Sequence, residues 1–159
     1  MKTKTKTAKI LIIDPTKRTV TEDWLPLHPE EGVGPQIATK DTRRILKCTG
    51  VDAFSMRPWG YGNTRCFGDG NGLPDEGVAG DFFQLGDPTK CHPIPGISFL
   101  IDHDAPTDGF SDVTPSVADI ERMITWSRRV VRDMPVTVMD TEDGMGVVVG
   151  LTAPIVETE

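Results

Sequence analysis

The residues best suited to bind a ligand lie close together in the middle of the chain. Arg57, Trp59, Tyr61 and Arg65 alternate cations with aromatic rings around a glycine-rich turn. Guanidinium groups pair with phosphates and carboxylates, and aromatic rings stack on bases or on other rings. If the flanking segments form a hairpin, these side chains predict a pocket for a nucleotide-like or otherwise anionic ligand. The alternative is that the rings cover the edge of the core and the arginines are solvated.

Two further arginines, Arg43 and Arg44, follow Lys40 in a segment with helical periodicity. We expect one of them to contribute to the same pocket, either within one chain or across a homodimer. A run of charges on a helix is also typical of a solvated helix face, and that alternative stays open.

The segment Asp102-His103-Asp104 follows a predicted strand and could hold a metal ion or a general base. Adjacent side chains on a strand point to opposite faces, so Asp102 and Asp104 share a side that His103 does not. This geometry weakens an acid–base pair. Two alternatives stay open. The two carboxylates bind a metal ion, as in a metal-dependent hydrolase, or the segment is an ordinary polar strand end.

The soft and imidazole ligands that zinc prefers occur at Cys66, Cys91, His92 and His103. Structural zinc sites present paired ligands two to four residues apart at both ends, whereas here two ligands are adjacent and neither Cys66 nor His103 has a nearby partner. The adjacent pair Cys91-His92 lies in a proline-rich, extended stretch, where neighbouring side chains diverge. The sequence therefore favours free cysteines over a zinc site or a cysteine nucleophile, and it predicts no cofactor.

An acidic, glycine-rich stretch over 68–77 contains Asp69, Asn71, Asp75 and Glu76, whose oxygen atoms are of the kind that calcium prefers. The spacing does not follow a calcium-loop pattern, because leucine and proline stand where further ligands and a glycine are needed. We interpret the stretch as a structural turn.

The charge balance excludes a general affinity for polyanions. The 159 residues carry a net charge of −7, with +4 over residues 1–50 and −11 over residues 51–159. Such a chain is repelled by nucleic acid backbones and acidic membrane surfaces. The three cysteines are too few and too widely spaced for a disulfide framework, and no apolar run is long enough to span a membrane. We therefore expect a cytoplasmic protein.

Hydrophobic periodicity predicts short strands joined mostly by hairpins, together with two helices. The predicted strands cover 8–14, 19–24, 51–58, 64–67, 81–85, 97–101, 126–131, 136–139 and 146–151. The first is a nearly continuous apolar run, which predicts a central strand buried on both faces and joined to 19–24 in a hairpin. We expect hairpins also between 51–58 and 64–67 and between 136–139 and 146–151.

One predicted helix covers 39–48, capped by Thr39 or Asp41 and ended by Gly50, with Ile45, Leu46 and Cys48 facing inward. The other opens at Thr114-Pro115, with proline at its first position, and has an apolar face formed by Val117, Ile120, Met123 and Ile124. Loops are expected over 25–35 and 102–112. The sequence thus predicts an α+β fold, with a single, mainly antiparallel sheet and both helices on one face. The domain spans 8–151, between a flexible basic tail (1–7) and a C-terminal tail (152–159).

The order of several short segments resembles a family of small proteins encoded by phages, plasmids and other mobile elements, catalogued as a domain of unknown function. The segments are 10–15, 18–22, 45–50, 72–74, 82–83 and 95–97. The resemblance implies an accessory protein of a mobile element that interferes with host machinery or defence, and it supplies no catalytic residue.

These observations predict a binding protein without enzymatic activity, whose ligand is small and anionic. The alternative is an interaction module or inhibitor whose acidic C-terminal two-thirds occupies a basic groove on a host protein.

Overall fold

The computed structural model describes residues 6–48, 50–69, 79–87, 91, 93–132, 136–140, 146–150 and 155–156. Its elements, in chain order, are β1 (Lys6–Asp14), β2 (Thr19–His28), β3 (Gln36–Ile37), α1 (Thr39–Leu46), β4 (Val51–Ser55), the 3₁₀ turn η1 (Arg57–Trp59), β5 (Thr64–Asp69), β6 (Ala79–Leu85), β7 (Ile94–Pro95), β8 (Ser98–Asp104), β9 (Gly109–Ser111), α2 (Val117–Met123), β10 (Ile124–Arg132), β11 (Val136–Asp140), β12 (Gly146–Gly150) and β13 (Ile155–Val156).

Antiparallel strands make up the main sheet, in the order β3-β2-β1-β8-β5-β4, and β9 also pairs with β8. β1 was predicted to be central and buried on both faces, and this is confirmed: Ile10, Leu11 and Ile13 are fully buried. The predicted hairpin between β1 and β2 is also confirmed, with Asp14 opposite Thr19. The carboxylate of Asp14 accepts hydrogen bonds from the backbone amides of Thr16 and Lys17 and so stabilises the turn.

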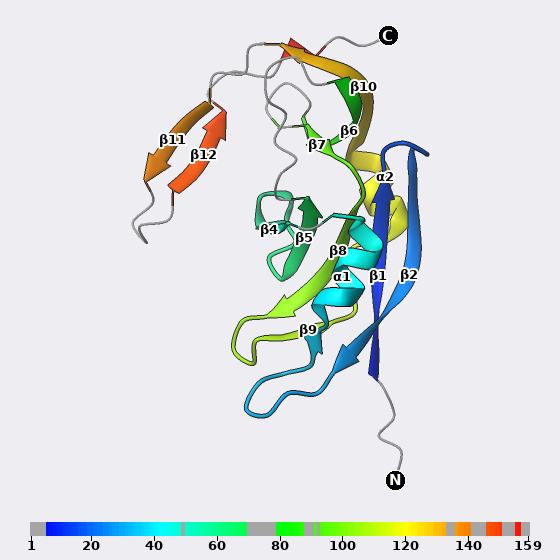
Figure 1. Ribbon diagram of the computed structural model, residues 1–159, viewed down its shortest axis with the longest axis vertical. Helices are drawn as coiled ribbons and strands as arrows, with labels where there is room; N and C mark the ends of the chain where they lie inside the picture. The colour runs from blue at the N-terminus through cyan, green and yellow to red at the C-terminus, as the bar shows by residue number, and fades with distance from the viewer. Residues whose placement is uncertain are drawn as a thin grey trace.

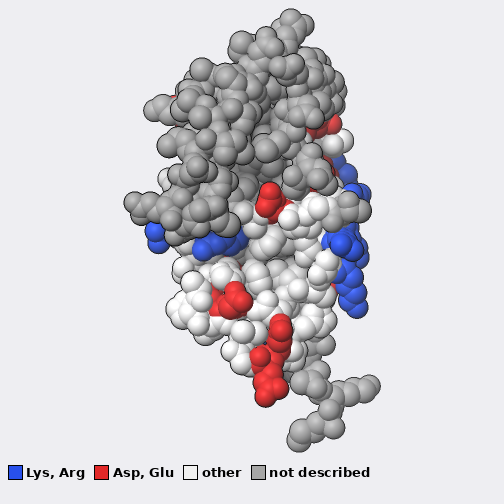
Figure 2. Space-filling view, turned by 60° about the vertical axis from the view of Figure 1, so that its left-hand side comes forward, with Lys and Arg blue, Asp and Glu red and all other residues white. Residues whose placement is uncertain are grey.

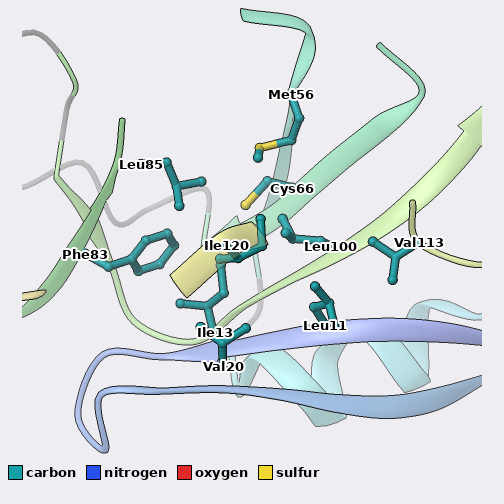
Figure 3. Packing of buried hydrophobic residues seen from close by; sticks show 10 residues of the cluster. All are labelled: Leu11, Ile13, Val20, Met56, Cys66, Phe83, Leu85, Leu100, Val113 and Ile120. Carbon is teal, nitrogen blue, oxygen red and sulfur yellow. The ribbon is translucent and has the colours of Figure 1, made fainter. Parts of the chain in front are cut away.

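The alternation of β1 divides the core into two clusters. Leu11 and Ile13 belong to cluster 1, which also contains Ile120 of α2, and Figure 3 shows Ile120 above the β1–β2 hairpin. Ala8 and Ile10 belong to cluster 2, which contains Leu46 of α1. The two helices therefore pack on opposite sides of the main sheet, and Figure 1 shows α1 in front of it and α2 behind.

A second sheet, in the order β13-β10-β6-β7, closes cluster 1 from the other side with Phe83 and Leu85 of β6. β11 and β12 form a separate antiparallel pair, as predicted. The predicted α+β class is confirmed. The sequence predicted one sheet with both helices on one face, whereas the described residues form three sheets with a helix on each side of the main one. Two-sided burial of β1 is the physical reason, because each apolar face needs its own cover.

α1 covers cluster 2 with Leu46, while Ile45 and Cys48 pack against it as predicted. The helix ends two residues earlier than predicted, because Lys47 adopts a left-handed conformation (φ 54°) and its amide bonds to the Arg43 carbonyl. The predicted caps Thr39 and Asp41 are wrong, since the helix begins after Ala38 without a side-chain cap.

α2 starts at Val117, so the prediction that it opens with Pro115 at its first position is wrong by two residues. Ser116 is the cap: its hydroxyl accepts from the Asp119 amide, and the Asp119 carboxylate accepts from the Ser116 amide. This capping box satisfies the backbone amides of Ser116 and Asp119, which would otherwise lack a partner at the start of the helix. The predicted apolar face is confirmed, because Ile120 is buried and Met123 packs against cluster 1.

β2 continues to His28, so the prediction of a loop from residue 25 is wrong over its first four positions. Leu25 and Leu27 are fully buried in cluster 2, which offsets the poor strand propensity of Pro26. β3 pairs with β2 only at Leu27 and His28, so Pro26 lies on a stretch of strand edge where a missing amide is tolerated.

The predicted loop over 102–112 is also wrong, because β8 runs to Asp104 and turns back into β9. At the termini, β1 already begins at Lys6, inside the predicted tail, and β13 lies within the predicted C-terminal tail and pairs with β10. The remaining tail positions lie outside the described residues. No helix in the described ranges is long and apolar enough to cross a membrane.

Candidate functional site

The predicted hairpin between β4 and β5 is confirmed, with Ser55 opposite Arg65. Its connection contains the turn η1, which ends at Gly60, whose φ of 89° favours glycine. Along β5, Cys66 packs into cluster 1 and Phe67 packs against cluster 2. Since successive side chains alternate, Arg65 lies on the same side as Phe67. The hairpin therefore distributes the predicted site residues over two sides of the sheet.

Trp59 and Tyr61 are half-buried and pack against cluster 1. The indole Nε1–H of Trp59 donates to the Leu85 carbonyl at 3.0 Å, which ties the hairpin to β6. A Cβ atom at Gly86 would lie 2.7 Å from this nitrogen, so the indole is closely enclosed. These contacts match the alternative in which the two rings cover the edge of the core. Both rings therefore point away from the Arg65 side of the sheet.

Arg65 is half-buried and held by one nitrogen only. Its Nη1 donates to the carbonyls of Gly62 (2.9 Å) and Thr64 (3.2 Å), and lies 3.4 Å from the Ser55 hydroxyl. Its Nε and Nη2 have no hydrogen-bond partner among the residues that the structure describes. These two N–H groups form the side of a guanidinium that can receive both oxygens of a phosphate or carboxylate.

Aromatic rings accompany Arg65 on this side of the sheet. Phe67 stacks on the buried Phe99, with centroids 5.1 Å apart and planes at 8°, and Phe110 of β9 lies 6.0 Å from Phe67. His103 lies 5.0 Å from Phe110. Phe67, Phe110 and His103 are all half-buried. We call the surface formed by Arg65, Phe67, His103 and Phe110 the β5–β8 face.

Sequence reasoning missed Phe67 and Phe110 as site residues. A signal for Phe67 was present, because it stands two positions after Arg65 in a predicted strand and must share its side. Phe110 had no such signal, since its strand was predicted as a loop.

The other predicted cations lie around this face. Arg57 is exposed on η1, and its backbone amide donates to the Ser55 hydroxyl that also faces Arg65. Arg43 and Arg44 are exposed on α1, on the cluster 2 side, and Arg44 pairs with Asp41 at 3.9 Å. Figure 2 shows Lys and Arg side chains at two edges of one view, with acidic groups both between them and below them.

Asp102 serves the fold. It is 7% exposed, and its Oδ1 accepts from the Thr64 hydroxyl at 2.7 Å and from the Thr114 amide at 3.1 Å. Its Oδ2 accepts from the Thr114 hydroxyl. Asp104 is exposed and accepts from Thr107 across the β8–β9 turn. The two carboxylates thus already have protein donors, and in the searched ranges no three His, Cys, Asp or Glu side chains could hold a metal ion.

All three cysteines lie in the described ranges, and none of them forms a disulfide. Cys66 is fully buried in cluster 1, and burial raises the pKa of its thiol to about 12, which keeps it protonated. Since His103 lies on the other side of β8, it cannot share a zinc ion with Cys66. Cys91 is half-buried, whereas His92 lies outside the described residues, as do Asn71, Asp75 and Glu76 of the predicted glycine-rich turn.

The chain matches no family model, and neither the curated proteins nor the solved structures contain a significant match to it.

Proposed function

We propose that the protein is a non-enzymatic binding protein that holds a small, nucleotide-like anionic ligand on the β5–β8 face. The observation that carries this proposal is the Arg65 guanidinium, which Nη1 fixes to the hairpin while Nε and Nη2 stay available. A cation held in place before binding loses little conformational entropy when the ligand arrives. The half-buried Phe67 beside it offers a ring for stacking.

The proposal keeps the ligand class that the sequence predicted and changes the residues that bind it. Arg65 keeps its role, and Phe67 takes the stacking role that was assigned to Trp59 and Tyr61. The three cysteines, none of which forms a disulfide, support the predicted cytoplasmic environment. The origin in a mobile element stays a prediction.

Isothermal titration of the purified chain against nucleoside monophosphates and cyclic nucleotides tests the proposal. We expect saturable binding to at least one of them, with at least a tenfold loss in Arg65→Gln. Lys17→Gln is the matched control, because it removes one positive charge from the exposed β1–β2 turn. No heat of binding across the whole series at high protein concentration would refute the proposed function.

A further inference from the structure

The geometry of the β5–β8 face indicates which kind of nucleotide-like anion it binds. This inference rests on the proposed function. The anionic part follows from Arg65. With Nη1 engaged by Gly62, Thr64 and Ser55, the guanidinium offers one pair of N–H groups, Nε and Nη2. One such pair receives one phosphate or one carboxylate, so the face provides a single strong anion subsite.

Along β5, the subsite is followed by an acidic side chain. Asp69 stands four residues from Arg65 on β5, about 13 Å away at the rise of an extended strand, and alternation places it on the same side. Val51 at the start of β4 pairs with Asp69, and Cys48 lies just before it. Burial and Asp69 raise the pKa of the Cys48 thiol, and Arg43 lowers it. A second phosphate placed along β5 beside the first therefore approaches a carboxylate.

The planar part of the ligand follows from Phe67. Phe99 occupies one side of its ring in a nearly parallel stack, and Phe110 meets it at an interplanar angle of 58°. The Phe67 side chain is nevertheless only half-buried. A planar group that stacks on the remaining side of the ring would continue the stack that Phe99 begins, next to the guanidinium of Arg65.

His103 adds a second nitrogen with hydrogen-bonding capacity to the same face. Its Nε2 lies 2.7 Å from the Asp108 carboxylate, which accepts a hydrogen bond from it. When the ring is neutral, the proton is on Nε2 and Nδ1 is an acceptor, to which no described residue donates. A ligand that satisfies this atom carries a hydroxyl or amino donor, as a nucleoside does.

We propose that the ligand of the β5–β8 face is a free nucleoside monophosphate, with its phosphate on Arg65 and its base stacked on Phe67. The ligand pairs one anionic group with one ring system, and additional phosphates along β5 approach the carboxylate of Asp69. The net charge of −7 opposes longer polyanions.

Titration of the full chain with AMP, ADP, ATP, adenosine, ribose 5-phosphate and a 5′-phosphorylated oligonucleotide tests this assignment. We expect AMP to bind at least tenfold more tightly than adenosine and ribose 5-phosphate, and no more weakly than ADP, ATP or the oligonucleotide. If ATP or the oligonucleotide binds tenfold more tightly than AMP, the monophosphate assignment is wrong while the proposed function stands. If none of these compounds binds, and no other nucleotide does, the proposed function itself fails.

Substitutions separate the two halves of the ligand. Phe67→Leu keeps an apolar side chain against cluster 2 but removes the ring, and should weaken AMP at least fivefold without changing the affinity for ribose 5-phosphate. Arg65→Lys keeps the charge but loses the paired N–H groups, and should weaken both compounds. Equal losses of both compounds in Phe67→Leu would contradict stacking on this ring.

Discussion

The carboxylate of Asp102 ties three parts of the fold together, and its replacement gives the sharpest test of the structure. The side chain is on β8, and it accepts from Thr64 on β5 and twice from Thr114 in the segment before α2. Asp102→Ala removes all three bonds and leaves the fully buried Thr64 hydroxyl without its acceptor. Asp102→Asn keeps one acceptor oxygen and loses the charge.

The expected magnitudes follow from the bonds. A hydrogen bond to a charged group contributes about 1.5–3 kcal/mol, and bonds in one network are not additive. We therefore expect Asp102→Ala to lower the free energy of unfolding by about 3–5 kcal/mol, and Asp102→Asn by about 1–2 kcal/mol. The larger loss is a substantial part of the roughly 5–15 kcal/mol that stabilises a typical domain.

Urea unfolding at pH 7, followed by tryptophan fluorescence, measures these losses as shifts of the midpoint at an unchanged denaturant slope. Asp104→Ala is the matched control, because this exposed carboxylate has only the bond from Thr107 and should change stability by about 0.5 kcal/mol or less. If Asp102→Ala were no more destabilising than Asp104→Ala, the carboxylate would not hold these elements together. Asp102→Asn keeps the test decisive if the alanine variant does not fold.

Three further predictions concern the backbone and the core. Gly34→Ala should destabilise the fold by more than 1 kcal/mol, because the new Cβ would lie 2.6 Å from the Gly109 Cα. Gly62→Ala is the control and should have little effect, since the space around this position is open. Equal urea midpoints for the two variants would contradict the close approach of Gly34 to Gly109. The Cys66 thiol should resist alkylation at pH 8 until the chain unfolds. Because the pKa of this thiol rises from 9.0 to about 12 on folding, the unfolded chain ionises first, and stability should fall as the pH rises from about 9 towards 12. Cys66→Ala should reduce this pH dependence. A slope equal to that of the wild type would refute the attribution of the pH dependence to Cys66. Ser98→Ala should be neutral or stabilising by up to about 1 kcal/mol, because the buried Ser98 hydroxyl has only the weakly hydrogen-bonding Cys66 thiol beside it among the described residues. A loss above about 1 kcal/mol in thermal unfolding would show that this hydroxyl has a stronger partner.

The strongly periodic segments could be predicted from the sequence. β1 reads as a continuous apolar run, and the apolar spacing of α2 placed Ile120 on its buried face. Boundaries failed where a tertiary contact outweighs a local signal. β2 passes through Pro26 because Leu25 and Leu27 are buried, and β8 continues through Asp102 because distant threonines satisfy its carboxylate.

The candidate site could be predicted only in part, for the same reason. Arg65 was identified from its residue type and its neighbours in the sequence. The assignment of Trp59 to the ligand did not take into account that β6, which is distant in sequence, supplies a carbonyl for its indole. Phe110 belongs to the site because β9 pairs with β8. The polar sequence around the short turn between these strands led to the prediction of a loop. The side of a sheet on which a residue lies follows from strand alternation, and applying this rule to β5 would have selected Phe67.

The most direct test of the β5–β8 face is a nuclear magnetic resonance titration of the chain with AMP. The Nε–Hε resonance of Arg65 and the ring resonances of Phe67 should shift progressively to saturation. The Trp59 indole resonance should stay in place, since its N–H is bonded to the Leu85 carbonyl on the other side of the sheet. A saturating shift of the Trp59 indole with an unchanged Arg65 resonance would contradict the location of the site.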